Sequence, residues 1–112
     1  MKKFLVLYKA SQADFERAMK STPEQGQAGM EAWKAWSNKA AAAIVDMGAP
    51  LGKPLLVTSK GMSPARNDLG GYSILKGESK EQVGELLKGH PHFLMGESAS
   101  IEVIDLVDLP GM

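Results

Sequence analysis

Residues Lys3 to Lys9 have the sequence KFLVLYK, in which five apolar side chains stand in an unbroken run between two lysines. A run of leucine, valine and aromatic residues of this length is typical of a β-strand that is buried on both faces. Successive side chains of a strand point to opposite faces, which places Phe4, Val6 and Tyr8 on one face and Leu5 and Leu7 on the other. We therefore predict a strand here whose two faces both need cover.

A second strand is predicted near the other end of the chain. Residues Ser100 to Leu109 alternate apolar and acidic side chains, and Pro110 ends the pattern. Apolar side chains again fall on both faces, with Ile101, Val103 and Val107 opposed to Ile104 and Leu106. A sheet face that the chain's own helices leave uncovered needs a partner, and the simplest partner is a second copy. The sequence thus predicts a homodimer that packs through this face.

The longest helix is marked at its start by a capping sequence. Thr22-Pro23-Glu24-Gln25 places a hydroxyl at the cap, a proline at the first helical position and a glutamine three residues after the cap. Apolar residues then recur every three or four positions, and Gly48 provides a stop signal. This pattern predicts a helix from Pro23 to Met47.

The remaining predicted elements are shorter. Ser79 and Gln82 form a second capping box, and the helix that they start is expected to end at Gly89. A short surface helix is expected over Ser11 to Lys20. The other predictions are strands at Pro54 to Ser59 and Gly71 to Leu75, a loop at Gly61 to Gly70 and irregular chain at His90 to Glu97.

The order of the main elements is β-α-β-β-α-β, which is the ferredoxin-like pattern. In this α+β fold a four-stranded antiparallel sheet carries both helices on one face. The length of 112 residues is that of one domain, and no internal repeat or linker divides the chain. We therefore predict a single domain over residues 1–112.

Composition excludes several classes of function. Thirteen basic and thirteen acidic residues give a formal net charge of +0, which provides no field to attract nucleic acid. The chain has no cysteine, which excludes disulfides, thiolate nucleophiles and iron-sulfur clusters. No apolar run is long enough to span a membrane, and the first residues do not form a signal peptide. We expect a cytoplasmic protein with no cofactor, no nucleic-acid partner and no membrane partner.

Several motifs taken together resemble a known family. They are MKKFLVLYK at residues 1–9, the pair Trp33 and Trp36, LGGYSIL at residues 69–75, and GHPHF at residues 89–93 followed by SIEV at residues 100–103. In this order they resemble the YCII-related proteins, in particular the DGPF branch. The resemblance covers nearly the whole chain. It implies a dimeric α+β barrel of ferredoxin-like subunits with a cleft between sheet and helices, and kinship in fold with small cofactor-independent isomerases, chlorinated-ring enzymes and monooxygenases.

The chain departs from that family in two places. The branch signature Asp-Gly-Pro-Phe falls in residues 59–64, where this sequence reads SKGMSP and keeps only the glycine of the motif. Some YCII-related members pair a histidine of the first long helix with an aspartate that precedes a proline. Here the helix has no histidine, and His90 stands before Pro91. The acid/base dyad of those members is therefore not carried over.

His90 and His92 are the only histidines in the chain, and we predict them as the catalytic residues of any acid/base chemistry. In extended backbone their i, i+2 spacing projects both imidazoles to the same side. A metal ion would need more ligands, and Glu85 and Glu97 have no recognisable spacing to the pair, so no metal is expected. The structural alternative is that one imidazole caps the C-terminal end of the preceding helix.

Six further side chains are candidates for ligand binding, namely Tyr8, Trp33, Trp36, Lys60, Arg66 and Tyr72. The tryptophans lie three residues apart on one helix face, where core packing is the first interpretation and a ligand wall the second. The tyrosines stand at the ends of strands, either aiming hydroxyls into a cleft or satisfied at the sheet rim. The two cations belong to a loop, which either binds a ligand or is simply solvated.

Two classes of function fit these observations. The first is a homodimeric protein that binds a small apolar or aromatic molecule between the sheet and the long helix, with cofactor-free acid/base chemistry at His90 or His92. The alternative is a non-catalytic interaction or sensory module that acts through protein contacts. An enzyme needs a tuned base in a pocket, whereas an interaction module needs none. The placement of the two imidazoles relative to a cavity therefore separates them.

Overall fold

The computed structural model describes residues 1–108 and Pro110 of the chain. Its main element is a four-stranded antiparallel sheet with the strand order β2-β5-β1-β6. The strands are β1 (Lys2–Lys9), β2 (Ile44–Pro50), β5 (Leu69–Gly77) and β6 (Ser100–Asp105). The ferredoxin-like α+β fold is confirmed. The strand β1 lies inside the sheet, where its unbroken apolar run finds neighbours on both sides.

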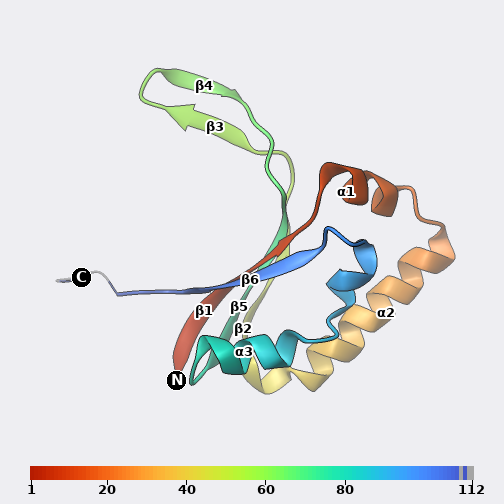
Figure 1. Ribbon diagram of the computed structural model, residues 1–112, viewed down its shortest axis with the longest axis vertical. Coiled ribbons are helices and arrows are strands. Elements are labelled where there is room, and N and C mark those ends of the chain that lie inside the picture. The colour runs from red at the N-terminus through yellow and green to blue at the C-terminus, as the bar shows by residue number, and fades with distance from the viewer. Residues whose placement is uncertain (109, 111–112) are drawn as a thin grey trace.

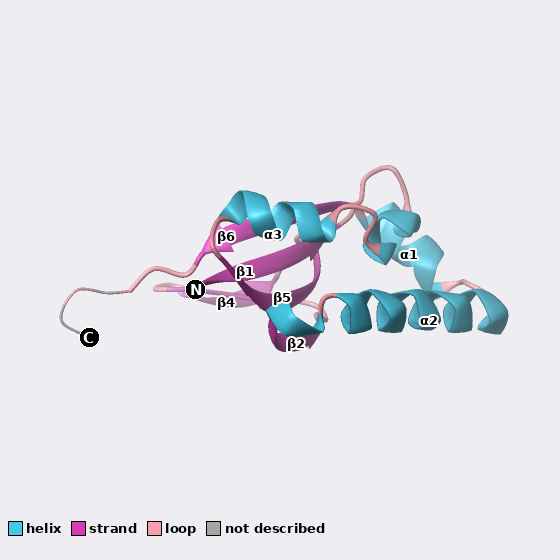
Figure 2. Ribbon diagram, turned by 90° about the horizontal axis from the view of Figure 1, so that it is seen from below, coloured by secondary structure: helices cyan, strands magenta, loops and turns pink. Residues whose placement is uncertain are grey.

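Two helices cover one face of this sheet. They are α2 (Pro23–Lys39) and α3 (Lys80–Leu87), and Figure 1 shows both on the same side of the strands. The short helix α1 (Gln12–Met19) lies beyond the end of the sheet, beside the outer part of α2 (Figure 2). Both predicted N-cap hydroxyls are present, since Thr22 and Gln25 form a reciprocal capping box and Ser79 accepts from the Gln82 backbone N–H, whereas the Gln82 side chain accepts from the Glu78 backbone N–H and leaves the second predicted box incomplete.

The predicted end of the long helix is wrong. The helix α2 ends at Lys39, a 3-10 turn η1 follows at Ala41–Ala43, and residues predicted as its last turns form the edge strand β2. Ile44 pairs with Leu75 of β5 and packs against the core, so tertiary pairing overrides a local pattern that suits helix equally well. Gly48 is no helix stop. It has φ of 73° within β2, where a Cβ would collide with the backbone of Tyr72.

The segment between β2 and β5 is the second correction. The predicted strand at Pro54 to Ser59 exists as β3 (Leu55–Thr58), but it pairs with β4 (Gly61–Pro64) in a separate two-stranded hairpin. The sequence pattern predicts the first strand of that hairpin in the main sheet and the second as part of a loop, and both predictions are wrong. Figure 1 shows the hairpin projecting from one end of the sheet, on the side away from α2.

The core lies between the helices and the β1 face that carries Phe4, Val6 and Tyr8. These three side chains are buried together with Leu75 of β5, and the helices contribute Trp36, Ala40, Val83 and Leu87. The opposite face of β1 carries Leu5 and Leu7, which are only half-buried. No helix of the described residues packs there, because α2 and α3 both pack against the face that carries Phe4, Val6 and Tyr8.

The chain between α3 and the last strand is more ordered than predicted. It forms a 3-10 helix, η2 (Pro91–Met95), in place of irregular chain, and His90 is its N-cap. The strand β6 ends at Asp105, before the predicted end at Leu109, which lies outside the described residues. Among residues 1–108 and 110, no helix is both long and apolar enough to cross a bilayer.

Candidate functional site

A cavity of about 450 Å³ lies at the end of the sheet from which the hairpin departs. Its wall is made by β1, β2, β5, α1, α2 and η2, and most of it is apolar. The side chains and backbone that line it belong to Tyr8, Phe15, Met30, Trp33, Met47, Gly48, Ala49, Pro50, Gly70, Gly71, Tyr72, His92 and Met95. Cavities of this volume and polarity commonly hold small molecules.

His92 is the one ionisable imidazole in this wall. The side chain is buried, and its Nε2 atom lies 2.8 Å from the backbone oxygen of Lys9. A carbonyl oxygen only accepts hydrogen bonds, so Nε2 carries the proton and Nδ1 of the neutral ring is an acceptor. Nδ1 has no hydrogen-bond partner within residues 1–108 and 110. Nδ1 of His92 is also not fully buried, because the one fully buried side-chain nitrogen without a partner in the described residues is Nε2 of His90. His92 thus lines the cavity and carries an acceptor nitrogen that has no partner among the described residues.

His90 has a different environment. Its ring is 1% exposed and is surrounded by aromatic rings, with centroids 4.3 Å from Trp33, 4.4 Å from Trp36 and 5.1 Å from Tyr8. Nδ1 accepts a hydrogen bond from the backbone N–H of His92 at 2.9 Å, and Nε2 is the buried nitrogen without a partner. Burial, with a smaller contribution from the neighbouring His92, lowers the pKa of His90 from 6.5 to about 4. His90 is therefore neutral near pH 7.

The predicted helix-capping role of a histidine is wrong in its direction. No imidazole donates to the last carbonyls of α3; instead, His90 accepts from the first turn of η2, as an N-cap does. The prediction that both imidazoles project to one side rested on extended backbone, whereas His92 lies within the 3-10 turn. Both rings nevertheless approach Tyr8, with His92 at 5.5 Å between centroids.

Tyr8 is fixed by a short hydrogen-bond chain. Its hydroxyl lies 3.0 Å from Oγ of Ser73, and that Oγ donates to the backbone oxygen of Met47 at 2.8 Å. The single proton of Ser73 is thereby used, so Tyr8 donates to Ser73. Burial raises the pKa of Tyr8 above its ordinary value of 10.0, and the hydrogen bond to Ser73 lowers it in part. Tyr8 is thus a neutral, rigid part of the wall.

The two tryptophans have separate roles in the structure. Trp36 is 7% exposed, belongs to the core and donates from Nε1 to the backbone oxygen of Leu86 at 3.2 Å. Trp33 is only partly buried, lines the cavity and meets Tyr8 edge to face at 5.2 Å between centroids. One turn of α2 therefore provides both a packing residue and a cavity residue.

The helix α1 closes one side of the cavity with Phe15. Asp14 is buried and accepts hydrogen bonds from the hydroxyl and the backbone N–H of Ser98, which ties α1 to the chain before β6. Gly70 allows the close approach of Phe15, because a Cβ at this position would overlap the phenyl ring. A larger residue at position 70 would therefore require the Phe15 ring to move.

The structure brings together four of the predicted site residues. Tyr8, Trp33, Tyr72 and His92 line the cavity, whereas His90 and Trp36 pack behind it. Lys60 and Arg66 are exposed on the hairpin segment and do not line the cavity. Among the described residues, no three His, Asp or Glu side chains are grouped as metal ligands.

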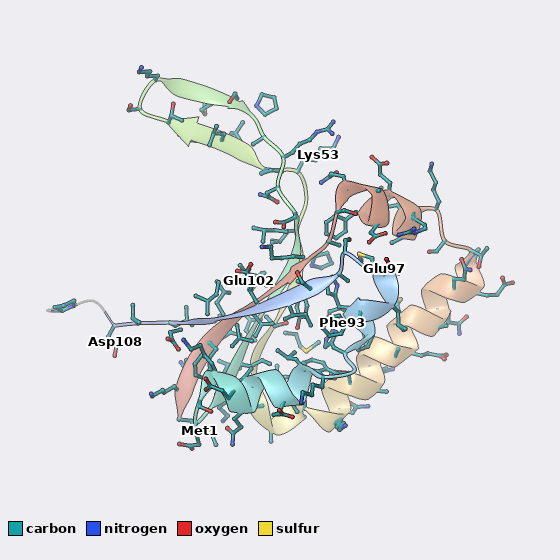
Figure 3. The ribbon with its side chains drawn as sticks, viewed as in Figure 1. Met1, Lys53, Phe93, Glu97, Glu102 and Asp108 are labelled. Carbon is teal, nitrogen blue, oxygen red and sulfur yellow. The ribbon has the colours of Figure 1, made fainter. Side chains whose placement is uncertain are left out.

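Sequence reasoning missed several apolar wall residues, chiefly Phe15, Met30, Met47 and Met95. Phe15 had been assigned to a surface helix and Met47 to the end of the long helix. Met30 carries the clearest sequence signal, because it lies one turn of α2 before Trp33 and so shares its helix face. In the structure its side chain is 75% exposed. Met95 follows His92 by three residues in η2, which lies between β6 and α2 and also carries Phe93, labelled in Figure 3.

Comparisons with known proteins show a likeness in fold. No family model matches the chain, and no curated protein matches it. A solved structure of 5-chloro-2-hydroxyhydroquinone dehydrochlorinase from Burkholderia phenoliruptrix AC1100, in complex with 2,5-dihydroxybenzoquinone, aligns with a TM-score of 0.52. The identity is 19%, and the alignment covers 89% of this chain and 90% of that one. The chain thus shares its α+β fold with this enzyme over nearly its whole length, while membership of the YCII-related family stays an expectation.

Proposed function

We propose that the protein binds a small planar aromatic molecule that carries a weakly acidic hydroxyl group, in the cavity between the sheet end and α2. The observation that carries this proposal is the state of His92. Its Nε2–H is held by the Lys9 carbonyl, and Nδ1 has no partner among the described residues, in a side chain that lines a mostly apolar cavity. A hydroxyl group of a ligand is the natural donor to such a nitrogen.

The same arrangement suits proton transfer without a cofactor. A phenolic or enolic hydroxyl that donates to Nδ1 of His92 can pass its proton to that nitrogen, which forms the imidazolium ion. The Lys9 carbonyl accepts from Nε2 in both states and stabilises the charged one. We assign this role to His92 alone, because His90 is enclosed by aromatic rings and its pKa is lowered to about 4.

The apolar wall supports an aromatic ligand in particular. Trp33 and Tyr8 stand edge to face, and Phe15 and Met95 add further apolar surface. A planar ring is well matched to such a wall, because aromatic and thioether groups make favourable contacts with ring faces and edges. The enzyme that shares the fold was solved with a hydroxylated quinone ring, which agrees with this ligand class.

Isothermal titration calorimetry with a matched pair of probes tests the proposal. 2-Naphthol and 2-methylnaphthalene have nearly the same shape, and only the first can donate to His92. We expect 2-naphthol to bind about tenfold more tightly, because one hydrogen bond to a buried acceptor is worth about 1 to 1.5 kcal/mol. In the His92→Phe variant, which keeps a planar ring but has no acceptor atom, the advantage of 2-naphthol should disappear.

Two further variants control for indirect effects. Gly71 lines the cavity, and a Cβ there would make only ordinary contacts, so Gly71→Val should fill the cavity and weaken binding of both probes. Lys39→Ala, at a separate surface cavity, should leave both affinities unchanged. If both probes bind equally to the unmodified protein, the assignment of His92 as the acceptor is wrong, and if Gly71→Val leaves binding intact, the assignment of the cavity is wrong.

We also propose that the protein is a homodimer that packs through the sheet face opposite the helices. Leu5 and Leu7 are half-buried there, and Ile104 of β6 on the same face is 38% exposed. An uncovered apolar face of this kind favours association. Light scattering at micromolar concentration should give twice the 12.0 kDa of one chain, and a mass of 12.0 kDa would exclude the dimer.

The alternative function, an interaction module without chemistry, is favoured by the β3–β4 hairpin, whose Leu55, Val57 and Met62 side chains are exposed. It predicts that His92→Phe changes no measurable property except stability. The calorimetric comparison therefore separates the two functions, because an interaction module has no reason to distinguish the naphthol from its methyl analogue.

A further inference from the structure

We infer that the β3–β4 hairpin is an arm that pairs, edge to edge, with strand β6 of a second copy of this chain. The inference rests on the proposed homodimer and goes beyond it, because it names which segments of the two copies exchange. Three independent features of the described residues lead to it: the exposure of the hairpin, the free edge of β6 and the segregation of charge between them.

The hairpin exposes apolar side chains on both of its faces. Leu55 is 61%, Leu56 50%, Val57 65% and Met62 71% exposed. Leu55 and Val57 lie on one face of the hairpin with Met62, and Leu56 lies on the other, because Val57 pairs with Met62 and side chains alternate. An isolated two-stranded hairpin is marginally stable in water. This hairpin therefore needs another surface to cover it and to complete its hydrogen bonding.

Strand β6 offers a matching free edge. It pairs with β1 on one side only and ends the strand order of the sheet, so its outer backbone groups have no strand partner among the described residues. The chain that continues from it is also apolar and exposed, with Leu106 at 47% and Val107 at 78%. An unprotected edge of this kind is a template for pairing with a strand from another chain.

The charges of the two segments are opposite. Residues 47–67 contain Lys53, Lys60 and Arg66 and no acidic residue. Residues 100–108 contain Glu102, Asp105 and Asp108 and no basic residue. Within one copy Glu102 pairs with Lys9 and Asp105 with Lys80, yet both carboxylate side chains stay 48% exposed. A chain of zero net charge thus carries both a basic apolar arm and an acidic apolar edge. This charge complementarity favours a second copy of the chain as the binding partner of the arm.

The arrangement of the two segments suits a two-fold axis. Figure 1 shows the hairpin and the chain after β6 extending from the sheet on the side away from α2, with the bare sheet face between them. Figure 3 places Lys53 at the base of the hairpin, and Glu102 and Asp108 along the C-terminal strand and its continuation. In a two-fold dimer each contact occurs twice. Each arm therefore pairs with the β6 edge of the other copy, and both arms and both edges are covered.

Disulfide trapping tests the inference directly, because the natural chain has no cysteine. A chain with Val57→Cys is mixed under mild oxidation with chains that carry Ile104→Cys, Leu106→Cys or Val107→Cys. We expect a covalent heterodimer with at least one of the three. A chain with Met30→Cys, which is 75% exposed on α2, is the matched control and should form none.

A charge exchange gives a second readout. The variant Lys53→Glu/Lys60→Glu and the variant Glu102→Lys/Asp108→Lys should each dimerise at least tenfold more weakly than the natural chain, because like charges then face each other. A mixture of the two variants should regain the natural affinity, since opposite charges meet again at both contacts of the heterodimer. Circular dichroism melts of each variant establish that the chains are folded.

The outcomes separate this inference from the proposals above it. If every variant dimerises like the natural chain and no Val57 crosslink forms, the arm is not in the interface and the inference is wrong, although the homodimer stands. If the natural chain is monomeric, both the arm exchange and the homodimer are wrong, and naphthol binding still tests the cavity. If Val57→Cys forms crosslinks with a different added protein and none with a second copy of this chain, the arm has another partner and the inference is also wrong.

Discussion

Replacing Trp36 by alanine is expected to lower the free energy of unfolding by about 3 to 5 kcal/mol, as the loss of a large buried aromatic side chain commonly does. Trp36 is 7% exposed, touches the ring of His90 and donates to the Leu86 carbonyl. The substitution therefore opens a void in the core and removes the hydrogen bond to the Leu86 carbonyl. Urea denaturation followed by circular dichroism measures the effect.

Trp33→Ala is the matched comparison, because it removes the same side chain one turn away on the same helix. Trp33 is only partly buried and lines the cavity, so we expect a smaller loss of stability and a larger loss of naphthol binding. Equal losses of stability in the two variants would contradict the separation of a packing residue from a cavity residue on α2.

Lowering the pH from 7 to 4 is expected to destabilise the fold through His90. In the unfolded chain this imidazole has a pKa near 6.5, and in the folded protein burial lowers it to about 4. Between these values the unfolded state binds more protons, so stability is fully present above pH 6.5 and is lost as the pH falls toward 4. The difference in pKa corresponds to about 3 kcal/mol.

The variant His90→Asn isolates this contribution. Asparagine can accept the hydrogen bond from the His92 amide as an N-cap and does not titrate. At pH 7 the variant should be less stable because the ring packing is lost, and the gap to the natural protein should narrow by about 3 kcal/mol on acidification. Urea titrations of both proteins at several pH values measure the gap. A gap that stays constant with pH would show that His90 is not the group that titrates.

Local sequence signals predicted the parts of the fold that depend on local physics. The run Lys3 to Lys9 is typical of an internal strand, and the N-cap hydroxyls of Thr22 and Ser79 mark helix starts through hydrogen bonds within four residues. The end of α2 was not predictable in this way. Residues Ile44 to Met47 suit a helix by spacing and a strand by composition, and pairing with β5 decides between them.

The candidate site was predictable by residue type and not by position. Histidine, tyrosine and tryptophan were chosen because few other residues offer chemistry, and Tyr8, Trp33 and His92 do line the cavity. Which histidine is enclosed depends on a single 3-10 turn after α3, and which tryptophan is in the core depends on the register of α2 against the sheet. Contacts between elements decide which of these side chains is buried, and the spacing of residues along the sequence does not reveal those contacts. The sequence predicts a loop where the β4 strand forms, and Lys60 and Arg66, expected near the ligand, instead lie on and just after the hairpin, away from the cavity.

The most direct test of the central claim is a long-range ¹H–¹⁵N correlation spectrum of the imidazole nitrogens, recorded with and without saturating 2-naphthol. The chain has two histidines, so His90→Asn identifies the signals of His92 by elimination. We predict that Nε2 of His92 is protonated throughout, and that Nδ1 moves from the shift of an unprotonated nitrogen toward that of a protonated or hydrogen-bonded one. If naphthol binds and the Nδ1 signal of His92 does not move, His92 is not the acceptor, and the account of this cavity is wrong.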